Sequence, residues 1–300
     1  MRKKGKIALA VDANNMNSSA LRKTSTLAQN IARQMNSQAE PVYALRPTEF
    51  YVPTELAPVP VFVPMDELKA EAVAKFKKLA KKTKLDMPTL KVVPCRGPSI
   101  TAEIESLNRY LKRNKYQMVI VSSRGKKGFQ RFFMGSFTDA ALHTLEVPML
   151  IVNPKQQLSS SEIKNIMYAT DGSDESFYAF LKLVVLAARL KCSITLLTIL
   201  PTPTRWARPY VRFNSVRYTK MVLKKFSTWI LKAKKKGVIA YVEVVRSEEN
   251  VVQAIVGVAH KKTDIIALSA RSTAAPLATI MGVSHKLVYL AKEPVLILKS

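Results

Sequence analysis

The chain has 300 residues, 48% of them hydrophobic, enough to bury a sizeable core, and its length suggests one large domain or two domains of about 150 residues each. It carries 48 basic and 21 acidic residues, a formal net charge of +27, and both halves share this excess. Two cysteines, Cys95 and Cys192, without C-x-x-C spacing, exclude a disulfide-rich secreted scaffold and predict a reducing, cytoplasmic setting.

The amino-terminal segment does not have the pattern of a secretion signal. Its apolar run, IALAV, is short and is followed at once by Asp12. Since every apolar stretch falls far short of the roughly 20 residues of a membrane helix, we expect a soluble chain without a membrane span. Its charge favours polyanions such as nucleic acid, anionic lipid or nucleotides, although lysine that only confers solubility explains the charge equally well.

The first half alternates strands and helices. Apolar runs predict buried strands at 6–12, 41–46, 90–95, 118–123 and 148–153, and amphipathic segments predict helices at 18–37, 66–84, 99–114 and from 135 on. A long proline-bearing loop is expected at 47–64. This order requires a five-stranded parallel sheet with helices on both faces. Asp12 and Ser122 then lie at carboxyl ends of strands, where open α/β sheets bind ligands.

The segment after the fourth strand has the composition of an anion site. Residues 124–134 contain Gly125 and several cations, Arg124, Lys126, Lys127 and Arg131. Gly135 and Ser136 then open a helix, whose first N–H groups and positive dipole end point back at the loop. A phosphate can accept hydrogen bonds there, while Gly125 lets the backbone come close. A loop that uses glycine only to turn is the alternative.

The spacing Ser122-x-x-Gly125, nine residues, then Gly135-Ser136 closely resembles the nucleotide-binding signature of the universal stress protein family, G-x-x-G-x9-G-[S/T]. Only the first glycine departs, being Ser122. In the nucleotide-binding members of that family the motif holds the ribose and phosphates of ATP. The resemblance implies a nucleotide site in the first half formed by Asp12, Leu45 through its backbone, Ser122, Gly125, Gly135, Ser136 and Phe137. For Asp12, and for Asp171 of the second half, a helix-capping or turn-stabilising role is the alternative to binding a ribose or an adenine amino group.

The second half repeats the first. After a polar linker at 153–164, the segment 165–176 matches the first strand and its turn, with Asp171 in the place of Asp12. The last segment aligns with residues 117–153 without a gap, and its counterparts of the motif residues are Ser269, Ser272, Gly282 and Val283. Such self-similarity predicts two domains of one fold, residues 1–155 and 163–300. The second lacks the loop glycine, the hydroxyl and the loop cations except Arg271, so Asp171 and Gly282 are its remaining candidates.

The other elements of the second half follow the same order. Helices are expected at 175–191, up to about 236, and 248–261, strands at 193–200 and up to 245, and a loop at 201–214. The segment 201–218, which includes this loop, alternates arginines with aromatic residues, a composition suited to stacking on nucleic-acid bases. The alternative is that the aromatic residues pack on the domain and the arginines are solvated. The basic helices at 69–84 and 220–236 leave polyanion binding open.

No metal site or familiar catalytic motif is recognised. His143, His260 and His285 are isolated, and the chain has neither a Walker A lysine motif nor a G-x-S-x-G elbow. An enzyme is not expected beyond weak ATP hydrolysis.

The fold class expected is therefore two tandem flavodoxin-like or Rossmann-like α/β domains. The resemblance implies an adenine-nucleotide-binding stress-response regulator, with ATP favoured, with or without Mg. It also implies pairing of the two halves as a pseudo-dimer through residues 148–153 and 294–299, and a homodimer is a further expectation. The alternative is a protein that binds nucleic acid or another polyanion on the same fold with a weakened nucleotide site.

Overall fold

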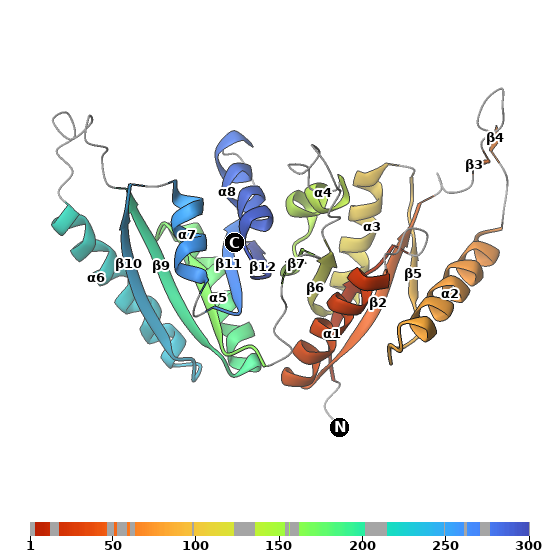
Figure 1. The fold of residues 1–300 in the computed structure, drawn as a ribbon, viewed down its shortest axis with the longest axis horizontal. Coiled ribbons are helices and arrows are strands. Elements are labelled where there is room, and N and C mark those ends of the chain that lie inside the picture. The colour runs from red at the N-terminus through yellow and green to blue at the C-terminus, as the bar shows by residue number, and fades with distance from the viewer. Residues whose placement is uncertain are drawn as a thin grey trace. The chain divides into compact units, whose positions relative to one another are not determined.

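A computed structural model describes residues 4–12, 18–46, 51–52, 59–60, 64–97, 99–122, 136–153, 156, 162–201, 215–248, 250–260, 263–270 and 277–299. The chain divides into two compact units, Met1–Met149 and Leu150–Ser300, and the boundary falls within a strand, Met149–Val152, that pairs with the sheet of the first unit. Each is an alternation of strands and helices (Figure 1). In the described part of the chain no helix is both long and apolar enough to cross a membrane.

The first unit follows the predicted order. Its elements are β1 (Gly5–Ala10), α1 (Ser18–Gln34), β2 (Ser37–Leu45), β3 (Tyr51–Val52), β4 (Val59–Pro60), α2 (Met65–Lys82), β5 (Lys91–Pro94), α3 (Ile100–Arg113), β6 (Tyr116–Ser122), α4 (Ser136–Thr144) and β7 (Met149–Val152). The short antiparallel pair β3–β4 falls in the segment predicted to be a loop, so that prediction was incomplete.

Strand β2 begins earlier than the apolar pattern predicts. Ser37 already pairs with Gly5 of β1, whereas pairing with β5 begins only at Val42. Pro41 therefore lies in a stretch where β2 is still an edge strand, and there the missing N–H of a proline is tolerated.

The strand order in the first unit is β7-β6-β1-β2-β5. Strand β1 pairs in parallel with β2 on one side and with β6 on the other. Chain order therefore reverses between β1 and β6, which makes this point the topological switch of the sheet.

The second unit repeats this arrangement. Its elements are β8 (Asn165–Ala169), α5 (Asp174–Leu190), β9 (Ser193–Pro201), α6 (Ser215–Lys234), β10 (Ala240–Ser247), α7 (Val251–Ala259), β11 (Ile265–Ala270), α8 (Leu277–Leu290) and β12 (Val295–Lys299). The order is β10-β9-β8-β11-β12, with parallel pairing throughout. The switch point lies between β8 and β11, and the prediction of one fold in both halves is confirmed.

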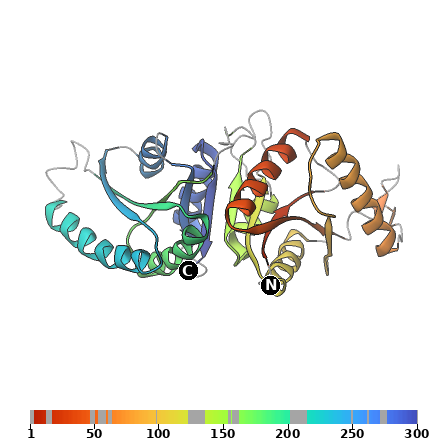
Figure 2. The same cartoon turned by 90° about the horizontal axis from the view of Figure 1, so that it is seen from below.

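Helices cover both faces of each sheet. In Figure 2 the red and orange helices α1 and α2 lie on one side of the first unit's strands, and the yellow α3 lies on the other. In the second unit the green and cyan helices α5 and α6 share one side, and α7 lies opposite. The central strands of each sheet are largely buried, as the continuous apolar runs predict, whereas the edge strands β5 and β10 are partly exposed.

Local signals set the ends of several helices. Ser99 and Ser173 cap α3 and α5 by accepting hydrogen bonds from the N–H groups of Ala102 and Ser176. Asn250 caps α7 in the same way, so this helix begins later than the predicted residue 248. Residues with positive φ follow four helices and end them one to three residues before their predicted ends: Asn36, Lys84, Lys115 and Lys191.

Both cysteines and one residue of the predicted linker are buried. Cys95 and Cys192 lie in the core and form no disulfide, and burial raises the pKa of Cys192 to about 12. Gln156, in the segment predicted to be a linker, is only 3% exposed. Its Nε2 donates to the carbonyl oxygens of Ala291 and Glu293 at 3.1 and 2.6 Å, so part of this linker is packed within the second unit.

Candidate functional site

The candidate site of the first unit lies at its switch point. Ala10 of β1 is paired with Val121 of β6. Asp12, two residues beyond Ala10, and Ser122, one residue beyond Val121, therefore lie at the same edge of the sheet. The topology thus brings together the two strand-end residues that the sequence singled out, which are more than a hundred residues apart.

Leu45 ends the neighbouring strand β2 at the same edge. Its side chain is buried, and its carbonyl oxygen accepts a hydrogen bond from the N–H of Cys95 at 3.0 Å. This carbonyl oxygen is therefore already a hydrogen-bond acceptor for the residue that follows β5. A contact between the Leu45 backbone and an adenine base stays a prediction.

The phosphate cradle is described only in part. Gly125 and Gly135 lie outside the described residues. Ser136 is the first described residue of α4, and nothing is described of its side chain. Phe137 is half-buried, and Asp139 adds a carboxylate to the first helical turn. The contacts of these residues with a nucleotide stay predictions.

A basic residue at this edge was not singled out from the sequence. Arg46 follows Leu45, and its Nε lies 2.9 Å from Oε2 of Glu103 in the first turn of α3. The Glu103 side chain is 11% exposed and that of Arg46 32%, so the cation reaches solvent on the edge where Asp12 lies. The position of an arginine at the end of the strand at 41–46 was the available signal.

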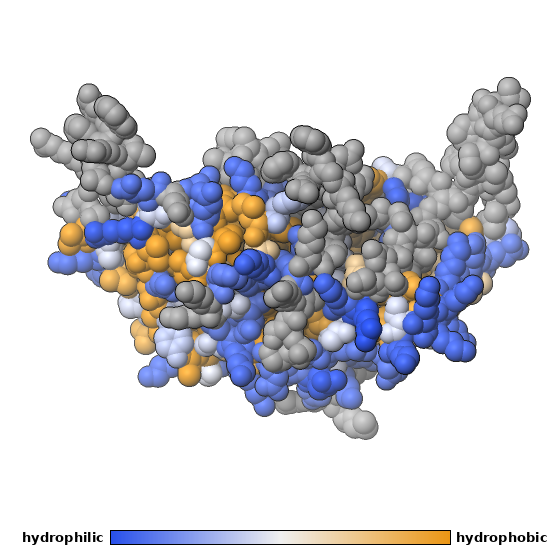
Figure 3. Space-filling view, viewed as in Figure 1, coloured by the Kyte–Doolittle hydropathy of each residue, from blue (hydrophilic) through white to orange (hydrophobic). Residues whose placement is uncertain are grey.

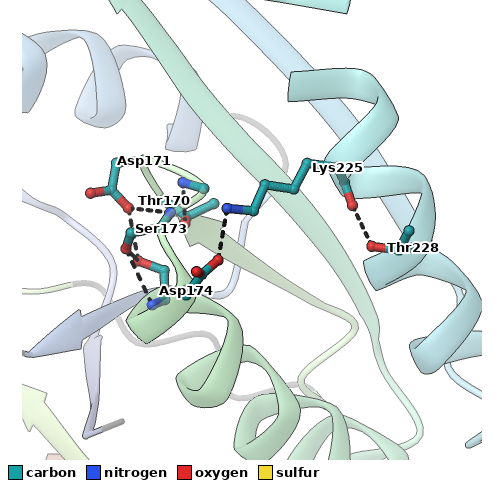
Figure 4. A network of polar contacts seen from close by, with 8 residues as sticks. Thr170, Asp171, Ser173, Asp174, Lys225 and Thr228 are labelled. Atoms are coloured by element: carbon teal, nitrogen blue, oxygen red, sulfur yellow. Dashed lines mark hydrogen bonds and ion pairs between the residues drawn. The ribbon is translucent and has the colours of Figure 1, made fainter. Parts of the chain in front are cut away.

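In the second unit, Asp171 organises the turn that leads into α5. One of its carboxylate oxygens, Oδ1, accepts from the N–H of Ser173 and from the hydroxyl of Ser176, both at 2.9 Å. Gly172 occupies the turn at φ 72°, a conformation that glycine adopts without strain. Figure 4 shows Asp171 directed toward Ser173, while Lys225 of α6 reaches Asp174 at 2.9 Å.

The network continues to the neighbouring strand. The Ser176 hydroxyl lies 3.1 Å from that of Ser269 on β11, the counterpart of Ser122. The Tyr168 hydroxyl donates to the carbonyl oxygen of Ser176 at 2.7 Å, and burial raises the pKa of Tyr168, so this phenol stays a donor. The turn-stabilising role that was the alternative to ligand binding is therefore present at Asp171, while Ser173 caps the helix.

Replacing Asp171 with alanine is expected to lower the free energy of unfolding by about 1–2 kcal/mol. Two donors at the start of α5 would lose a charged acceptor, and a helix cap would weaken. Urea unfolding followed by circular dichroism measures this change. Asp174→Ala is a matched control, since its exposed pair with Lys225 contributes about 1 kcal/mol or less. Equal effects of the two substitutions would contradict the turn-stabilising role of Asp171.

Gly282 does not occupy a helix start. It lies inside α8, which extends from Leu277 to Leu290. An N–H group in the interior of a helix is used in the bond to the residue four positions earlier, so it is not offered to an anion. This observation supports the prediction that the second cradle is degraded.

Metal ligands do not gather in the described part of the chain: no group of three or more His, Cys, Asp or Glu side chains is close enough to hold an ion. His260 instead lies 3.0 Å from the Lys292 ammonium nitrogen.

Comparisons with known proteins agree with this fold and its duplication. The sequence model of the universal stress protein family matches residues 4–153 and again residues 162–299. A universal stress protein from Archaeoglobus fulgidus DSM 4304 is similar over 98% of this chain and 96% of its own, with a TM-score of 0.62 and 14% sequence identity.

A putative universal stress protein from Pseudomonas aeruginosa UCBPP-PA14 is similar over 98% of this chain and 92% of its own, with a TM-score of 0.57 and 12% identity. A comparison with curated protein sequences gives no match. Because the two family matches together cover nearly the whole chain, the chain belongs to the universal stress protein family and contains its domain twice.

Proposed function

We propose that the first half of the chain binds an adenine nucleotide, ATP in particular, and that binding regulates a partner in a stress response. The observation that carries this proposal is the meeting of Asp12 and Ser122 where the strand order reverses. The glycine and cation pattern of the nucleotide signature begins at Ser122 itself. Membership of the family supports the same assignment.

Each residue has a distinct role in this proposal. The Asp12 carboxylate accepts from a ribose hydroxyl, and the backbone at Gly125 and Gly135 approaches the phosphates. Ser136 donates its hydroxyl to a phosphate oxygen. A Mg²⁺ ion would arrive with the nucleotide and be held mainly by its phosphates. The residues proposed here include no positioned general base, so binding rather than rapid hydrolysis is expected.

Calorimetry of the intact chain is expected to show a single ATP site. In the second half, Ser272 would crowd the phosphate, Val283 lacks a hydroxyl, and Gly282 lies in the interior of a helix. Loss of the hydroxyl alone costs about 0.5–1.5 kcal/mol for a neutral partner and more for a phosphate. Two equal sites per chain would contradict this asymmetry. An Asp12→Ala variant with unchanged affinity would contradict the ribose contact.

Polyanion binding is a second candidate function, supported by a cationic groove on the first unit. A cavity of about 520 Å³ is lined by Arg96, Arg109, Lys112 and Arg113, with Glu146 paired to Lys112 at 2.7 Å. Helix α6 of the second unit adds cations and has no acidic residue along its length. Such surfaces concentrate nucleic acid through its phosphates.

Fluorescence anisotropy with a single-stranded RNA tests this candidate between about 50 and 200 mM salt. An Arg109→Glu, Arg113→Glu variant is expected to bind more weakly and to lower the salt slope by about 0.7 for each phosphate that it no longer neutralises. A Lys77→Glu, Lys78→Glu variant on α2 carries the same charge change away from the groove. Equal weakening in both variants would show a general charge effect and no site at α3.

Pairing of the two halves through their last strands, formation of a homodimer and a cytoplasmic location stay predictions. Light scattering of the intact chain tests the homodimer directly.

A further inference from the structure

The second unit has a cavity far from its Asp171 turn. It measures about 500 Å³ and lies at the amino-terminal ends of the strands, between β8, β9, β10 and α7. Asn165, on its wall, precedes Asp171 by six residues, which is roughly 20 Å along an extended chain. On this face of the second unit, apolar surface gathers over α7, β9 and β10 (Figure 3). The volume falls in the range of about 300–1,000 Å³ found for small-molecule sites.

The internal repeat shows which residues fill the same place in the first unit. Met167 pairs with Thr195 as Ala8 pairs with Glu40, so Thr195 takes the place of Glu40. Asn165 takes the place of Lys6 by the alignment that matches Asp171 with Asp12. By the alignment that matches Ser269 with Ser122, the counterparts of Tyr116 and Tyr110 are Thr263 and Gly257.

In the first unit these four positions carry large side chains that interact with one another. The Tyr116 hydroxyl donates to Oε2 of Glu40, and burial together with this bond raises the pKa of Tyr116, so it remains a donor. The Lys6 ammonium lies 3.5 Å from Oε1 of Glu40 and 5.7 Å from the centre of the Tyr116 ring. The rings of Tyr110 and Tyr116 are 5.9 Å apart.

In the second unit the same positions carry an amide, two small hydroxyls and a glycine. A Cβ atom placed on Gly257 would meet no atom within 4 Å, so the space that a ring occupies in the first unit is open here. Four replacements by smaller residues, in four separate segments of the chain, therefore line this cavity.

The wall of the cavity offers hydrogen-bonding groups. Asn165 Oδ1 accepts from the hydroxyls of Ser193 and Thr195, both at 3.2 Å, which fixes the direction of the amide. The Thr263 hydroxyl is buried and lacks a hydrogen-bond partner among the described residues, an unfavourable state that a small rotation toward the cavity would relieve. Tyr241, 56% exposed, contributes an aromatic ring at the rim.

The charge of the cavity differs from that of the protein. Among the described residues that line it there is no lysine or arginine, and Glu243 supplies a carboxylate. The whole chain nevertheless carries a net charge of +27. Phosphates and other anions are therefore disfavoured here, and neutral hydrogen-bonding molecules are favoured.

We propose that this cavity is a second binding site, for a small neutral polyhydroxylated molecule of the monosaccharide or disaccharide class. Hydroxyl and amide groups match sugar hydroxyls as both donors and acceptors. The carboxylate of Glu243 accepts from sugar hydroxyl groups, and the ring of Tyr241 covers the apolar C–H face of a sugar. This site is independent of the nucleotide site proposed in the first half.

Saturation-transfer NMR on the intact chain tests this site with glucose, galactose and trehalose as probes. At least one of them is expected to bind, and glucose 6-phosphate is expected to bind about threefold to tenfold more weakly than glucose because of the carboxylate. Gly257→Tyr restores the ring that the first unit has, and Tyr241→Ala removes the ring at the rim. Each is expected to weaken binding by about tenfold or more.

Two controls separate loss of the site from loss of folding. Tyr178→Ala removes a ring of similar exposure, 60%, from α5 and is expected to leave binding unchanged. Gly257→Tyr replaces a poor helix former where a Cβ meets nothing, so its melting temperature is expected not to fall. Binding of none of the three sugars would overturn the proposal, and so would binding that Gly257→Tyr and Tyr241→Ala leave unchanged.

Discussion

A Gly135→Val variant of the intact chain is expected to bind ATP about a hundredfold more weakly than the parent, or not at all. A β-branched side chain would stand where the sequence predicts that the backbone meets a phosphate, immediately before Ser136. Hydrogen bonds to a charged group contribute about 1.5–3 kcal/mol each, and each 1.4 kcal/mol is tenfold in affinity. Losing two of them therefore accounts for the expected change. Isothermal titration calorimetry measures it.

The repeat supplies a matched control for this variant. Gly282→Val makes the same substitution at the counterpart of Gly135, but inside α8 of the second unit. ATP affinity is expected to stay at the parent's value, since that position does not offer a free N–H group. If Gly135→Val binds as tightly as the parent, the nucleotide site is elsewhere. If both variants lose binding, the asymmetry between the halves is wrong.

A Trp229→Ala variant is expected to lose about 3–5 kcal/mol of stability in the second unit. Trp229 of α6 is 2% exposed and lies at the centre of an aromatic cluster that joins α6 to α5 and β8. Its ring centre is 5.1 Å from that of Phe180, 5.2 Å from Phe226 and 5.3 Å from Phe177. Truncation would remove this ring packing and leave a cavity, because the neighbouring rings cannot all shift inward.

Urea unfolding followed by circular dichroism measures this loss. Tyr178→Ala is the control, since it removes an aromatic ring from the adjoining helix α5 at a position 60% exposed. Its expected effect lies within about 0.5 kcal/mol. A Trp229→Ala variant as stable as Tyr178→Ala would show that the α5 and α6 layer does not hold the second unit together.

The sequence determined the order of the elements and the duplication. Buried parallel strands appear as apolar runs and surface helices as apolar positions at helical spacing, and both signals are local. The repeat of Asp12 as Asp171 and the gapless match of the last segments were also readable directly. Helix ends were less certain, because residues such as Asn36 and Lys191 adopt positive φ without glycine's sequence signal. The early start of β2 and the pair β3–β4 were missed because they depend on pairing with another strand, which the local sequence does not show.

The sequence also placed Asp12 and Ser122 at one edge, because strand ends and the order of crossovers suffice for that inference. Only the tertiary structure showed what Asp171, the counterpart of Asp12, does in the second unit. Its hydrogen bonds to Ser173 and Ser176 need side-chain directions that a motif does not contain.

The cavity of the second unit was decided by the tertiary structure alone. The four large side chains at this place in the first unit come from four elements: Lys6, Glu40, Tyr110 and Tyr116. None of them forms a recognisable motif with its neighbours in the sequence. Strand register brings the strand residues together and the packing of α3 adds Tyr110, so smaller residues at these positions in the second half leave one open space. The space left at one place in a core depends on the sizes of side chains that are far apart in the sequence. No local sequence pattern therefore predicts it.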